Sequence, residues 1–244
     1  MRIFIELLLQ KYLTYHLTQL LPISDGLQEV SHVLYSLTRD RLWKKVSNWI
    51  RHSKMNIVVL DEDLDRCAEY HVDKHIVKMP LEAAQLLCTN MWIDKYLGYV
   101  PEKLSKEQLA LLREKKTNEP RDFPYLPTMH NHPCTIWARS SLDNYEWLVC
   151  YAIALNEEYR YRYGKEHKSV REVILKLPDP VSLPRLGLTD FAQAMPDELK
   201  GKNAVIAYRD FYHKDKAVFA SWKYRDKPPW WNEEQADYEK RITR

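Results

Sequence analysis

The chain has 244 residues, a formal net charge of +3 and no run of about 18 uninterrupted apolar residues. These properties exclude a strongly basic nucleic-acid-binding protein and a membrane-spanning protein, so no membrane partner is expected. The four cysteines are widely spaced and form no Cys-x-x-Cys pair. Such spacing argues against a disulfide scaffold and favours a cytoplasmic protein.

Residues 1–54 differ in sequence pattern and charge from the rest of the chain. They are predicted to form two or three amphipathic helices, broken by a turn at residues 22–26, and they carry an excess of lysine and arginine. Residues 55–244 are near neutral, and the apolar run that follows Met55 looks like a natural chain start. We therefore expect a helical N-terminal extension over residues 1–54 and a helical domain over residues 55–244.

The domain is predicted to begin with a short extended segment after Met55, which leads to an aspartate that can cap the next helix. Helical periodicity then runs from about residue 64 to residue 79. Pro80 is expected to break this helix or to begin a second helix that continues to about Leu97.

Further helices are predicted along the rest of the domain. The Ser105–Gln108 segment has the form of a capping box and opens one helix, and another follows Ser141 with its apolar residues on one stripe. A third runs from about residue 203 to residue 223. Residues 117–133 and 178–196 are rich in proline and are expected to be ordered loops. Strand signals are few and short, so the predicted fold class is mainly α, a single helical domain with long ordered loops.

One polar face stands out on the predicted helices between residues 70 and 85. Five side chains recur at helical spacing and share this face: His71, His75, Lys78, Glu82 and Gln85. The opposite side is apolar. A solvated helix would instead alternate lysine and glutamate, so the face is a candidate site. The alternative is a polar face whose histidines are held by structural contacts, and the sequence leaves both readings open.

A second cluster begins at His130-Asn131-His132-Pro133, at a junction between a loop and a helix. Free backbone N–H groups at such a junction can bind an anion. The side chains there that are able to contact a phosphate or a base are Asn131, His132, Arg139, Asn144 and Tyr145. The alternative is a loop pinned by side-chain hydrogen bonds.

The C-terminal part of the domain carries a local excess of lysine and arginine over residues 200–227, interleaved with aromatic residues. This pattern is typical of a surface that faces nucleic acid, with Trp222 and Lys223 as candidate contacts. A solvated helix face with buried aromatic residues is the competing interpretation.

Other chemistries find less support. Four histidines can be combined into a zinc site, since His71 and His75 have i, i+4 spacing and His130 and His132 lie in the second cluster, but no cysteine or carboxylate completes a familiar metal signature. The chain has no GxSxG, GxxxxGK[ST] or GxGxxG motif. No metal and no cofactor are therefore predicted.

Several segments carry a family resemblance and together cover nearly all of residues 55–231: Val59–Gln85 with its Asp-Lys-His and Lys-Met-x-x-Glu-x-x-Gln patterns, Asn131–Leu148, Tyr163–Lys168, Gln193–Asp197 and Trp222-Lys223. In these segments the chain resembles a family of phage and bacterial proteins, mostly of unassigned function.

A more distant resemblance is to the pyrimidine-dimer DNA glycosylases of the endonuclease V type. These enzymes have an early helix with a catalytic glutamate, an Asn-His-Pro segment before a long helix, and an aromatic, basic C-terminus. The resemblance implies that Glu82 is that glutamate and that Asn131-His132-Pro133 is the equivalent turn. Those enzymes use a free N-terminal amine as nucleophile, whereas 54 residues precede Met55 here, so a hydrolytic mechanism is preferred to an amine-based lyase mechanism.

The leading hypothesis is therefore a DNA glycosylase that hydrolyses the N-glycosidic bond of an altered pyrimidine in double-stranded DNA. Departure of the base leaves an oxocarbenium-like sugar, which a carboxylate stabilises. Glu82, or else Asp63 or Asp73, is expected to supply it, while His75 and Lys78 protonate or hydrogen-bond the base. The base must leave the stack for a pocket lined by tyrosine or tryptophan.

The sequence leaves the altered base and two other functions open. Some bacterial antiphage glycosylases remove glucosylated hydroxymethylcytosine, and such a base is one expected substrate. Arg139 and the basic C-terminal helix are expected to hold the DNA backbone. The first alternative is a non-enzymatic, phage-related factor that binds nucleic acid or protein, and the second is an enzyme that acts on free nucleotides.

Overall fold

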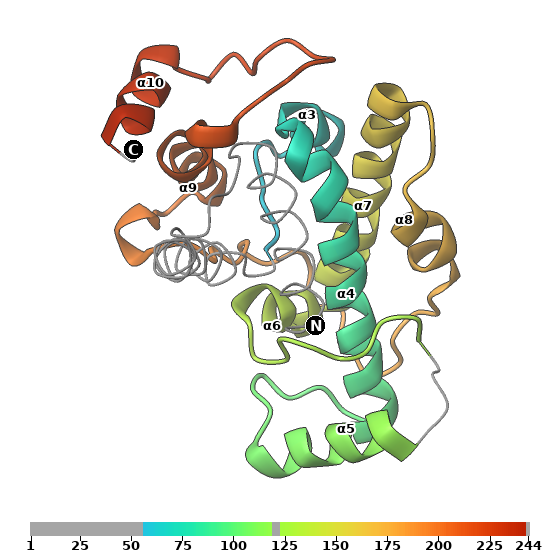
Figure 1. Cartoon of the computed structure of the whole chain (residues 1–244). Coiled ribbons are helices and arrows are strands. Elements are labelled where there is room, and N and C mark those ends of the chain that lie inside the picture. The colour runs from blue at the N-terminus through green and yellow to red at the C-terminus, as the bar shows by residue number, and fades with distance from the viewer. Residues whose placement is uncertain (1–55, 119–122, 243–244) are drawn as a thin grey trace, which may run out of the picture. The chain divides into compact units, whose positions relative to one another are not determined.

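The computed structural model describes residues 56–118 and 123–242, and residues 55–244 form one compact unit by themselves. Within the described residues the protein is mainly α-helical and has no β-strand (Figure 1), which confirms the predicted fold class. This unit begins at Met55. The helices predicted for residues 1–54 lie outside the described residues.

The elements follow in chain order: α3 (Leu64–Tyr70), α4 (Asp73–Leu97), α5 (Lys106–Asn118), α6 (Pro133–Ser140), α7 (Leu142–Tyr163), α8 (Lys168–Glu172), η1 (Ile174–Lys176), η2 (Asp197–Leu199), α9 (Ala204–Phe211), η3 (Tyr212–Lys216), η4 (Ala217–Phe219) and α10 (Glu233–Ile242). Residues 178–196 are irregular apart from turns, as predicted.

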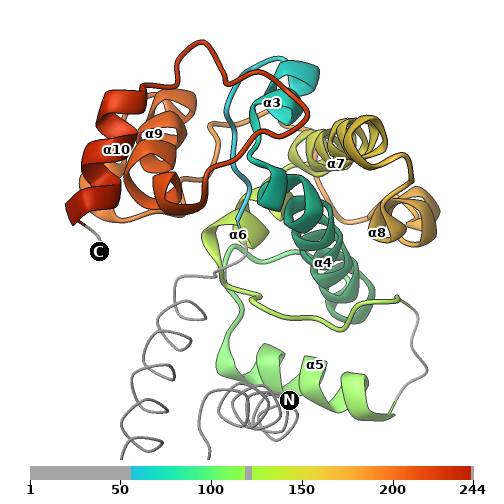
Figure 2. The ribbon, with the colours of Figure 1, turned by 45° about the horizontal axis from the view of Figure 1, so that its top comes forward.

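The two long helices α4 and α7 pack against each other at the centre of the domain (Figures 1 and 2). Helix α6 packs on both of them, α3 packs on α7, and α8 packs on α4 and α7. Helix α7 begins where the sequence predicts, because the Ser141 hydroxyl caps it by accepting from the N–H of Asp143. It ends at Gly164, whose positive φ of 66° suits a residue without a side chain. Helix α6 is not predicted by the sequence pattern.

The extended segment that precedes α3 runs through the core. Ile57, Val58, Val59 and Leu60 are all buried. An extended chain cannot satisfy its own backbone groups, so side chains from other elements do so. The Tyr151 hydroxyl lies 3.1 Å from the carbonyl oxygen of Val58, and Arg209 Nε donates to the carbonyl oxygen of Leu60 at 2.8 Å.

The predicted break at Pro80 is wrong. The chain breaks instead at His71 and Val72, which are both extended between α3 and α4. Pro80 lies inside α4, where its ring nitrogen has no hydrogen to donate to the preceding turn. The helix nevertheless continues through Pro80, and the carbonyl oxygen of nearby Val77 accepts a hydrogen bond from His167 Nε2 at 3.0 Å.

A buried ion network fixes the point at which α4 begins. Arg162 of α7 is fully buried and donates to Asp73 at 3.0 Å and to Glu158 at 2.5 Å. It also donates to the carbonyl oxygens of Glu69 and His71, so one guanidinium holds the whole turn between α3 and α4. The second oxygen of Asp73 accepts from the Ser221 hydroxyl.

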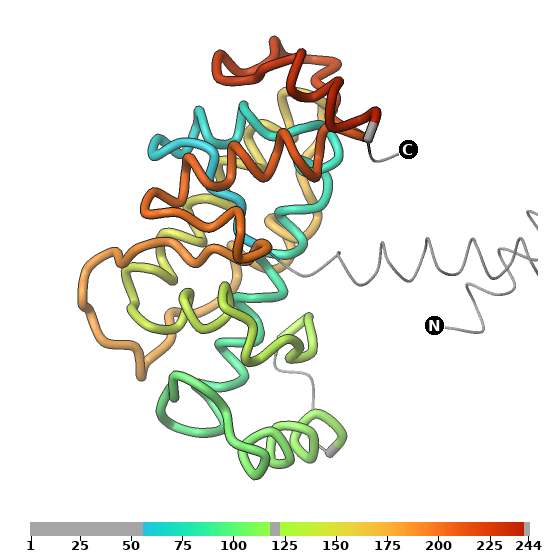
Figure 3. Tube along the Cα trace, turned by 90° about the vertical axis from the view of Figure 1, so that its left-hand side faces the viewer, coloured from blue at the N-terminus to red at the C-terminus, as the bar shows by residue number. Residues whose placement is uncertain are grey.

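Helix α5 is attached through a small core of its own, formed by Ile93, Leu104 and Leu112. Its predicted capping box is confirmed, because the Ser105 hydroxyl accepts from the N–H of Gln108 and the Gln108 side chain accepts from the N–H of Ser105. Figures 1 and 3 place α5 at one end of the domain, away from α9 and α10 at the other.

The long helix predicted from residue 203 to residue 223 is shorter and is not uniform. Asn203 caps α9 by accepting from the N–H of Ile206. After Phe211 the chain widens into a single π-helical turn, η3, and then tightens into the 3-10 turn η4, which ends at Phe219. Such π turns are rare and often occur at functional sites.

We predict that a chain consisting of residues 55–244 unfolds in one cooperative thermal transition. These residues hold their own core, which includes the buried segment Ile57–Leu60. Thermal unfolding of this shorter chain and of the full-length protein, both followed by circular dichroism, checks this prediction. A broad, non-cooperative melt of the shorter chain would show that residues 1–54 belong to the core.

Candidate functional site

Glu82 lies on α4 with only 4 % of its surface exposed, and both of its carboxylate oxygens have partners. Lys78 Nζ lies 2.8 Å from Oε1, and the backbone N–H of Asn56 donates to Oε2 at 3.1 Å. Burial raises the pKa of Glu82, while the charge and hydrogen bond of Lys78 and the N–H of Asn56 oppose that rise. A buried carboxylate held in this way is an uncommon arrangement in a protein interior.

Asn56 is itself held by three other parts of the domain. Its side-chain amide donates to the carbonyl oxygen of Ala194 at 3.0 Å. Its side-chain oxygen accepts from the Tyr208 hydroxyl at 2.9 Å and from the Cys134 thiol at 3.4 Å. The N–H that meets Glu82 is therefore fixed by α6, α9 and the irregular segment near residue 194.

His75 lies one helical step before Lys78 on the same face and is buried. Its Nδ1 is 2.5 Å from the Tyr212 hydroxyl of η3. Burial is the largest cause that lowers the pKa of His75 well below its ordinary value, and burial raises the pKa of Tyr212 well above its own. These directions keep both members of the pair neutral near pH 7.

His71 also belongs to the predicted polar face, and its role is structural. Its Nδ1 donates to the carbonyl oxygen of Cys67 at 2.6 Å, and its Nε2 lies 3.0 Å from the Tyr151 hydroxyl. Burial lowers its pKa to about 3. For this residue the alternative of a histidine held by structural contacts is the one that the structure supports.

Lys216, the last residue of η3, is a site residue that the sequence analysis did not single out. It is half-buried, and its Nζ lies 4.3 Å from the centre of the Phe211 ring. Burial lowers its pKa, and the charge of Lys78 lowers it further, whereas the charges of Asp215 and Glu82 raise it. The charges of Lys78 and Lys216 both lower the pKa of Glu82, and Lys78 is in direct contact with it. The sequence signal for Lys216 was only its place in a basic, aromatic stretch.

Two other candidate carboxylates have structural positions. Asp63 is exposed and caps α3 by accepting from the N–H of Arg66 at 2.9 Å. Asp73 belongs to the ion network of Arg162 and also accepts from the N–H of Lys223 at 3.0 Å. Of the three carboxylates proposed from the sequence, Glu82 is the one that the structure pairs with Lys78.

Arg139 is a structural residue, contrary to the expectation that it holds a phosphate. Only 2 % of its surface is exposed. Its guanidinium donates to three backbone carbonyl oxygens, those of Pro101 at 2.9 Å, His130 at 2.5 Å and Glu102 at 2.7 Å. A phosphate cannot reach a guanidinium that is enclosed and occupied in this way, so Arg139 is not part of the proposed site.

The other members of the second cluster also hold loops together. Asn131 exchanges two hydrogen bonds with the backbone of Leu104, and His132 caps α6 by accepting from the N–H of Cys134. Asn144 is fully buried and joins the carbonyl of Trp137 to Thr189, while Tyr145 is buried in the core. For this cluster the structure favours the reading of a pinned loop.

Trp222 and Lys223 lie where the C-terminal segment crosses the turn between α3 and α4. Trp222 Nε1 donates to the carbonyl oxygen of Tyr70 at 3.0 Å, and its ring meets that of Trp231 edge-on at 4.8 Å. The side chain of Lys223 is exposed. The indole of Trp222 thus has structural contacts, whereas the ammonium group of Lys223 faces solvent.

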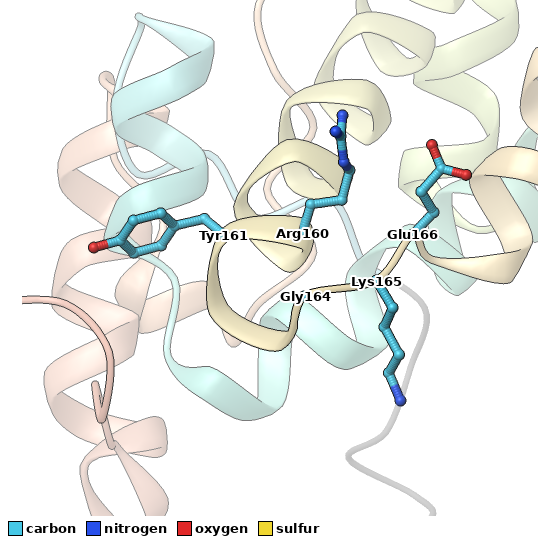
Figure 4. A pocket seen from close by; sticks show the side chains of 5 residues that line it. All are labelled: Arg160, Tyr161, Gly164, Lys165 and Glu166. Atoms are coloured by element: carbon cyan, nitrogen blue, oxygen red, sulfur yellow. The ribbon is translucent and has the colours of Figure 1, made fainter.

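Three hollows lie elsewhere on the described part of the domain. Figure 4 shows the one at the end of α7, where the side chains of Arg160, Tyr161, Lys165 and Glu166 point apart and do not converge on a ligand. The second lies at the start of α9. The third lies between the end of α4 and residues 172–182 and is lined by a mixture of apolar and oppositely charged side chains. None of these three hollows is lined by Glu82.

Within residues 56–118 and 123–242, no three histidine, cysteine or carboxylate side chains are grouped closely enough to bind a metal ion. No helix in the same part of the chain is long and apolar enough to cross a membrane.

Comparison of the sequence and the structure with protein-family models, curated proteins and solved structures finds no significant match.

We predict that Arg139→Ala lowers the free energy of unfolding by about 3 kcal/mol, because three buried carbonyl groups lose a charged donor. Arg171→Ala is the matched control, since Arg171 is exposed and pairs only with its neighbour Glu172 on the surface. It should change the free energy by less than about 0.5 kcal/mol. Urea denaturation measures both, and equal, small effects would return Arg139 to the list of possible DNA contacts.

Proposed function

We propose that this protein is a DNA glycosylase that removes an altered pyrimidine from double-stranded DNA, with Glu82 as the essential carboxylate. The observation that carries the proposal is the burial of Glu82 between Lys78 and the N–H of Asn56. A charge in such surroundings costs stability, and groups with shifted pKa values cluster at functional sites.

The proposed chemistry follows from the charge that develops during the reaction. When the base leaves, positive charge accumulates on the sugar, and a carboxylate with little surrounding water stabilises that charge strongly. Lys78 can then donate a hydrogen bond to the departing base, and the neutral imidazole of His75 can hydrogen-bond the base without protonating it.

The resemblance to the endonuclease V type supports the same residue. In those enzymes the N-terminal amine acts beside the catalytic glutamate, and here the nitrogen beside Glu82 belongs to Asn56, the residue after Met55. In this chain that nitrogen is an amide and is not nucleophilic. Water is therefore proposed as the nucleophile for base release.

Contact with the DNA backbone is proposed for the lysines around this site. Lys74 Nζ lies 5.0 Å from the ring centre of Phe219, which also packs on His75. Lys223 is exposed beside the first turn of α4. Binding through such lysines weakens steeply as salt is added. The aromatic rings of Phe219 and Trp222 are candidates to stack on an extruded base.

The substrate proposed from the resemblance is a damaged or hypermodified pyrimidine, with glucosylated hydroxymethylcytosine as one case, in a cytoplasmic defence against phage. The protein is incubated with plain duplexes and with duplexes that carry a pyrimidine dimer or glucosylated hydroxymethylcytosine, and abasic sites are counted. Salt-sensitive binding without base release would favour a non-enzymatic binding protein. Turnover of free nucleotides without action on DNA would favour the second alternative.

We predict that Glu82→Gln lowers the rate of base release by about 100–1,000-fold, the loss typical when charge stabilisation is removed from a transition state. The substitution keeps the shape and the acceptor for Asn56, and the 39 % exposed Lys78 side chain can turn its ammonium group to water, so the protein should still fold. Glu114→Gln is the control, because Glu114 is exposed on α5. Full base release by a folded Glu82→Gln protein would overturn the assignment.

We predict that the rate of base release falls as the pH is lowered, and that this fall occurs at a higher pH than it would for a catalytic glutamate with an ordinary pKa. Burial is the main cause that raises the pKa of Glu82 above 4.5, and the active form is the charged one. Activity is therefore present above the raised pKa and falls as the pH drops through it. The pH profile of the single-turnover rate measures this, and an acid limb at or below 4.5 would argue against Glu82.

A further inference from the structure

The imidazole of His75 has one ring nitrogen with a hydrogen-bond partner and one without. Only 7 % of the residue is exposed, and its Nδ1 lies 2.5 Å from the Tyr212 hydroxyl. For its Nε2, the described part of the chain supplies no hydrogen-bond partner. His71, four residues earlier, differs in this respect, because both of its ring nitrogens have partners.

The partner of Nδ1 determines which nitrogen of His75 carries the hydrogen. The Tyr212 hydroxyl is fully buried, and among the described residues its one hydrogen-bond partner is Nδ1 of His75. A buried O–H group without an acceptor is costly, so Tyr212 donates and Nδ1 accepts. Burial is the largest cause that lowers the pKa of His75 well below its ordinary value. The ring is therefore neutral near pH 7, and its single hydrogen lies on Nε2.

The Nε2–H group of His75 borders solvent. The side-chain polar atoms that are fully enclosed and unpartnered in the described residues are Asn90 Oδ1, the Tyr145 hydroxyl and Trp230 Nε1. Because Nε2 of His75 is not among them, an incoming ligand can reach it. The rings of Tyr212 and Phe219 meet the imidazole edge-on, with ring centres 5.3 and 5.8 Å away. The donor therefore has aromatic surroundings.

We propose that Tyr212 is a positioning residue that makes His75 a hydrogen-bond donor through Nε2, and that this donor recognises the O2 carbonyl oxygen of an extruded pyrimidine. The proposal rests on the proposed function, because it concerns the base that the site would release. A neutral donor among aromatic rings suits the carbonyl oxygen of a flat base, whereas a phosphate is better matched by charged lysines.

The O2 oxygen fits this role for two chemical reasons. It accepts hydrogen bonds in the unmodified pyrimidines, and it lies next to the nitrogen of the glycosidic bond. Negative charge therefore builds up on O2 as the base leaves, and a hydrogen bond to it becomes stronger in the transition state. A base that lacks O2 would leave the Nε2–H group unpaired, and sites built around such a hydrogen bond reject such analogues strongly.

The π-helical turn η3 is the element that carries the hydroxyl to the imidazole. Tyr212 is the first residue of η3, and His75 lies in the first turn of α4, 137 positions away in the sequence. The rare turn thus has a definite consequence at the site, because it supplies the group that fixes the tautomer of His75.

The first test reads the tautomer directly and does not depend on base release. Nitrogen NMR of the full-length protein with isotope-labelled histidines distinguishes a ring nitrogen that carries hydrogen from one that does not. The signals that are missing from a His75→Gln protein identify His75. We expect hydrogen on Nε2 in the wild-type protein, and hydrogen on Nδ1 there would overturn the proposal.

Tyr212→Phe keeps the ring and removes the hydroxyl, so a measurable fraction of the imidazole should carry its hydrogen on Nδ1 instead. Tyr238→Phe is the matched control, because Tyr238 is exposed on α10, and it should leave the tautomer unchanged. A folded Tyr212→Phe protein whose hydrogen stays wholly on Nε2 would overturn the role of Tyr212. The wild-type spectrum needs no variant of Tyr212, so it is decisive even where Tyr212→Phe folds poorly.

The second test identifies what Nε2–H contacts. The probes are duplexes with a pyrimidine dimer or glucosylated hydroxymethylcytosine, each with a 2′-fluorine that blocks departure of the base, and a duplex with a tetrahydrofuran residue that has no base. We expect the Nε2 signal of His75 to shift with an altered duplex and to stay unchanged with the base-free one. Equal shifts with all duplexes would assign the donor to the DNA backbone, and either this result or no shift at all would overturn the proposal.

Single-turnover base release tests the catalytic consequence separately. His75→Leu removes the donor and should lower the rate by about 10–100-fold, the effect expected for a hydrogen bond to a developing charge. His75→Gln places a side-chain N–H near the position of Nε2 and should restore most of the rate, and a rate no higher than that of His75→Leu would contradict the proposal. A wild-type protein that shows the NMR shift without base release would support the recognition of O2 and overturn the proposed function.

Discussion

The position at which α4 begins determines the geometry of the site. A helix turns by about 100° for each residue, so a shift of one residue at its start would turn every later side chain away from its present direction. The buried guanidinium of Arg162 prevents such a shift, because it binds Asp73 and the carbonyl oxygens of the preceding turn. His75, Lys78 and Glu82 face η3 and Asn56 as a consequence of this anchor. Removing one partner from such a buried ion pair is strongly destabilising. Asp73, a candidate catalytic carboxylate in the sequence, therefore has a structural role.

The polar residues of the second cluster, like Asp73, were candidates for function and have structural roles. Arg139, Asn131 and Asn144 are residue types that bind phosphates or bases when they are exposed. Here they satisfy backbone groups of long irregular segments, which cannot pair with themselves. A proline-rich loop that crosses a small domain needs such side chains, so the abundance of loops in this chain explains the abundance of apparently functional polar residues.

The sequence predicts the parts of the fold that local chemistry controls. The mainly α class, the capping box at Ser105 and the start of α7 at Ser141 all depend on side chains within a few residues of the feature. The break at His71 depends on a distant partner, Arg162, which the local sequence pattern cannot reveal. The same local pattern also did not predict that α4 continues through Pro80. The sequence also does not predict the π turn of η3 or the position of Lys216 at its end. Glu82, His75 and Lys78 were predicted together because helical spacing alone brings them to one face.

The pairing of Lys78 with Glu82 explains how a carboxylate can be kept charged in the interior of this domain. The ammonium group of Lys78 offsets part of the cost of burying the carboxylate. The Lys78 side chain is 39 % exposed, so in the proposed reaction its ammonium group can also meet a phosphate or a leaving base. The Glu82 side chain is only 6 % exposed, and a carboxylate with little water around it stabilises a sugar cation more strongly than an exposed carboxylate does.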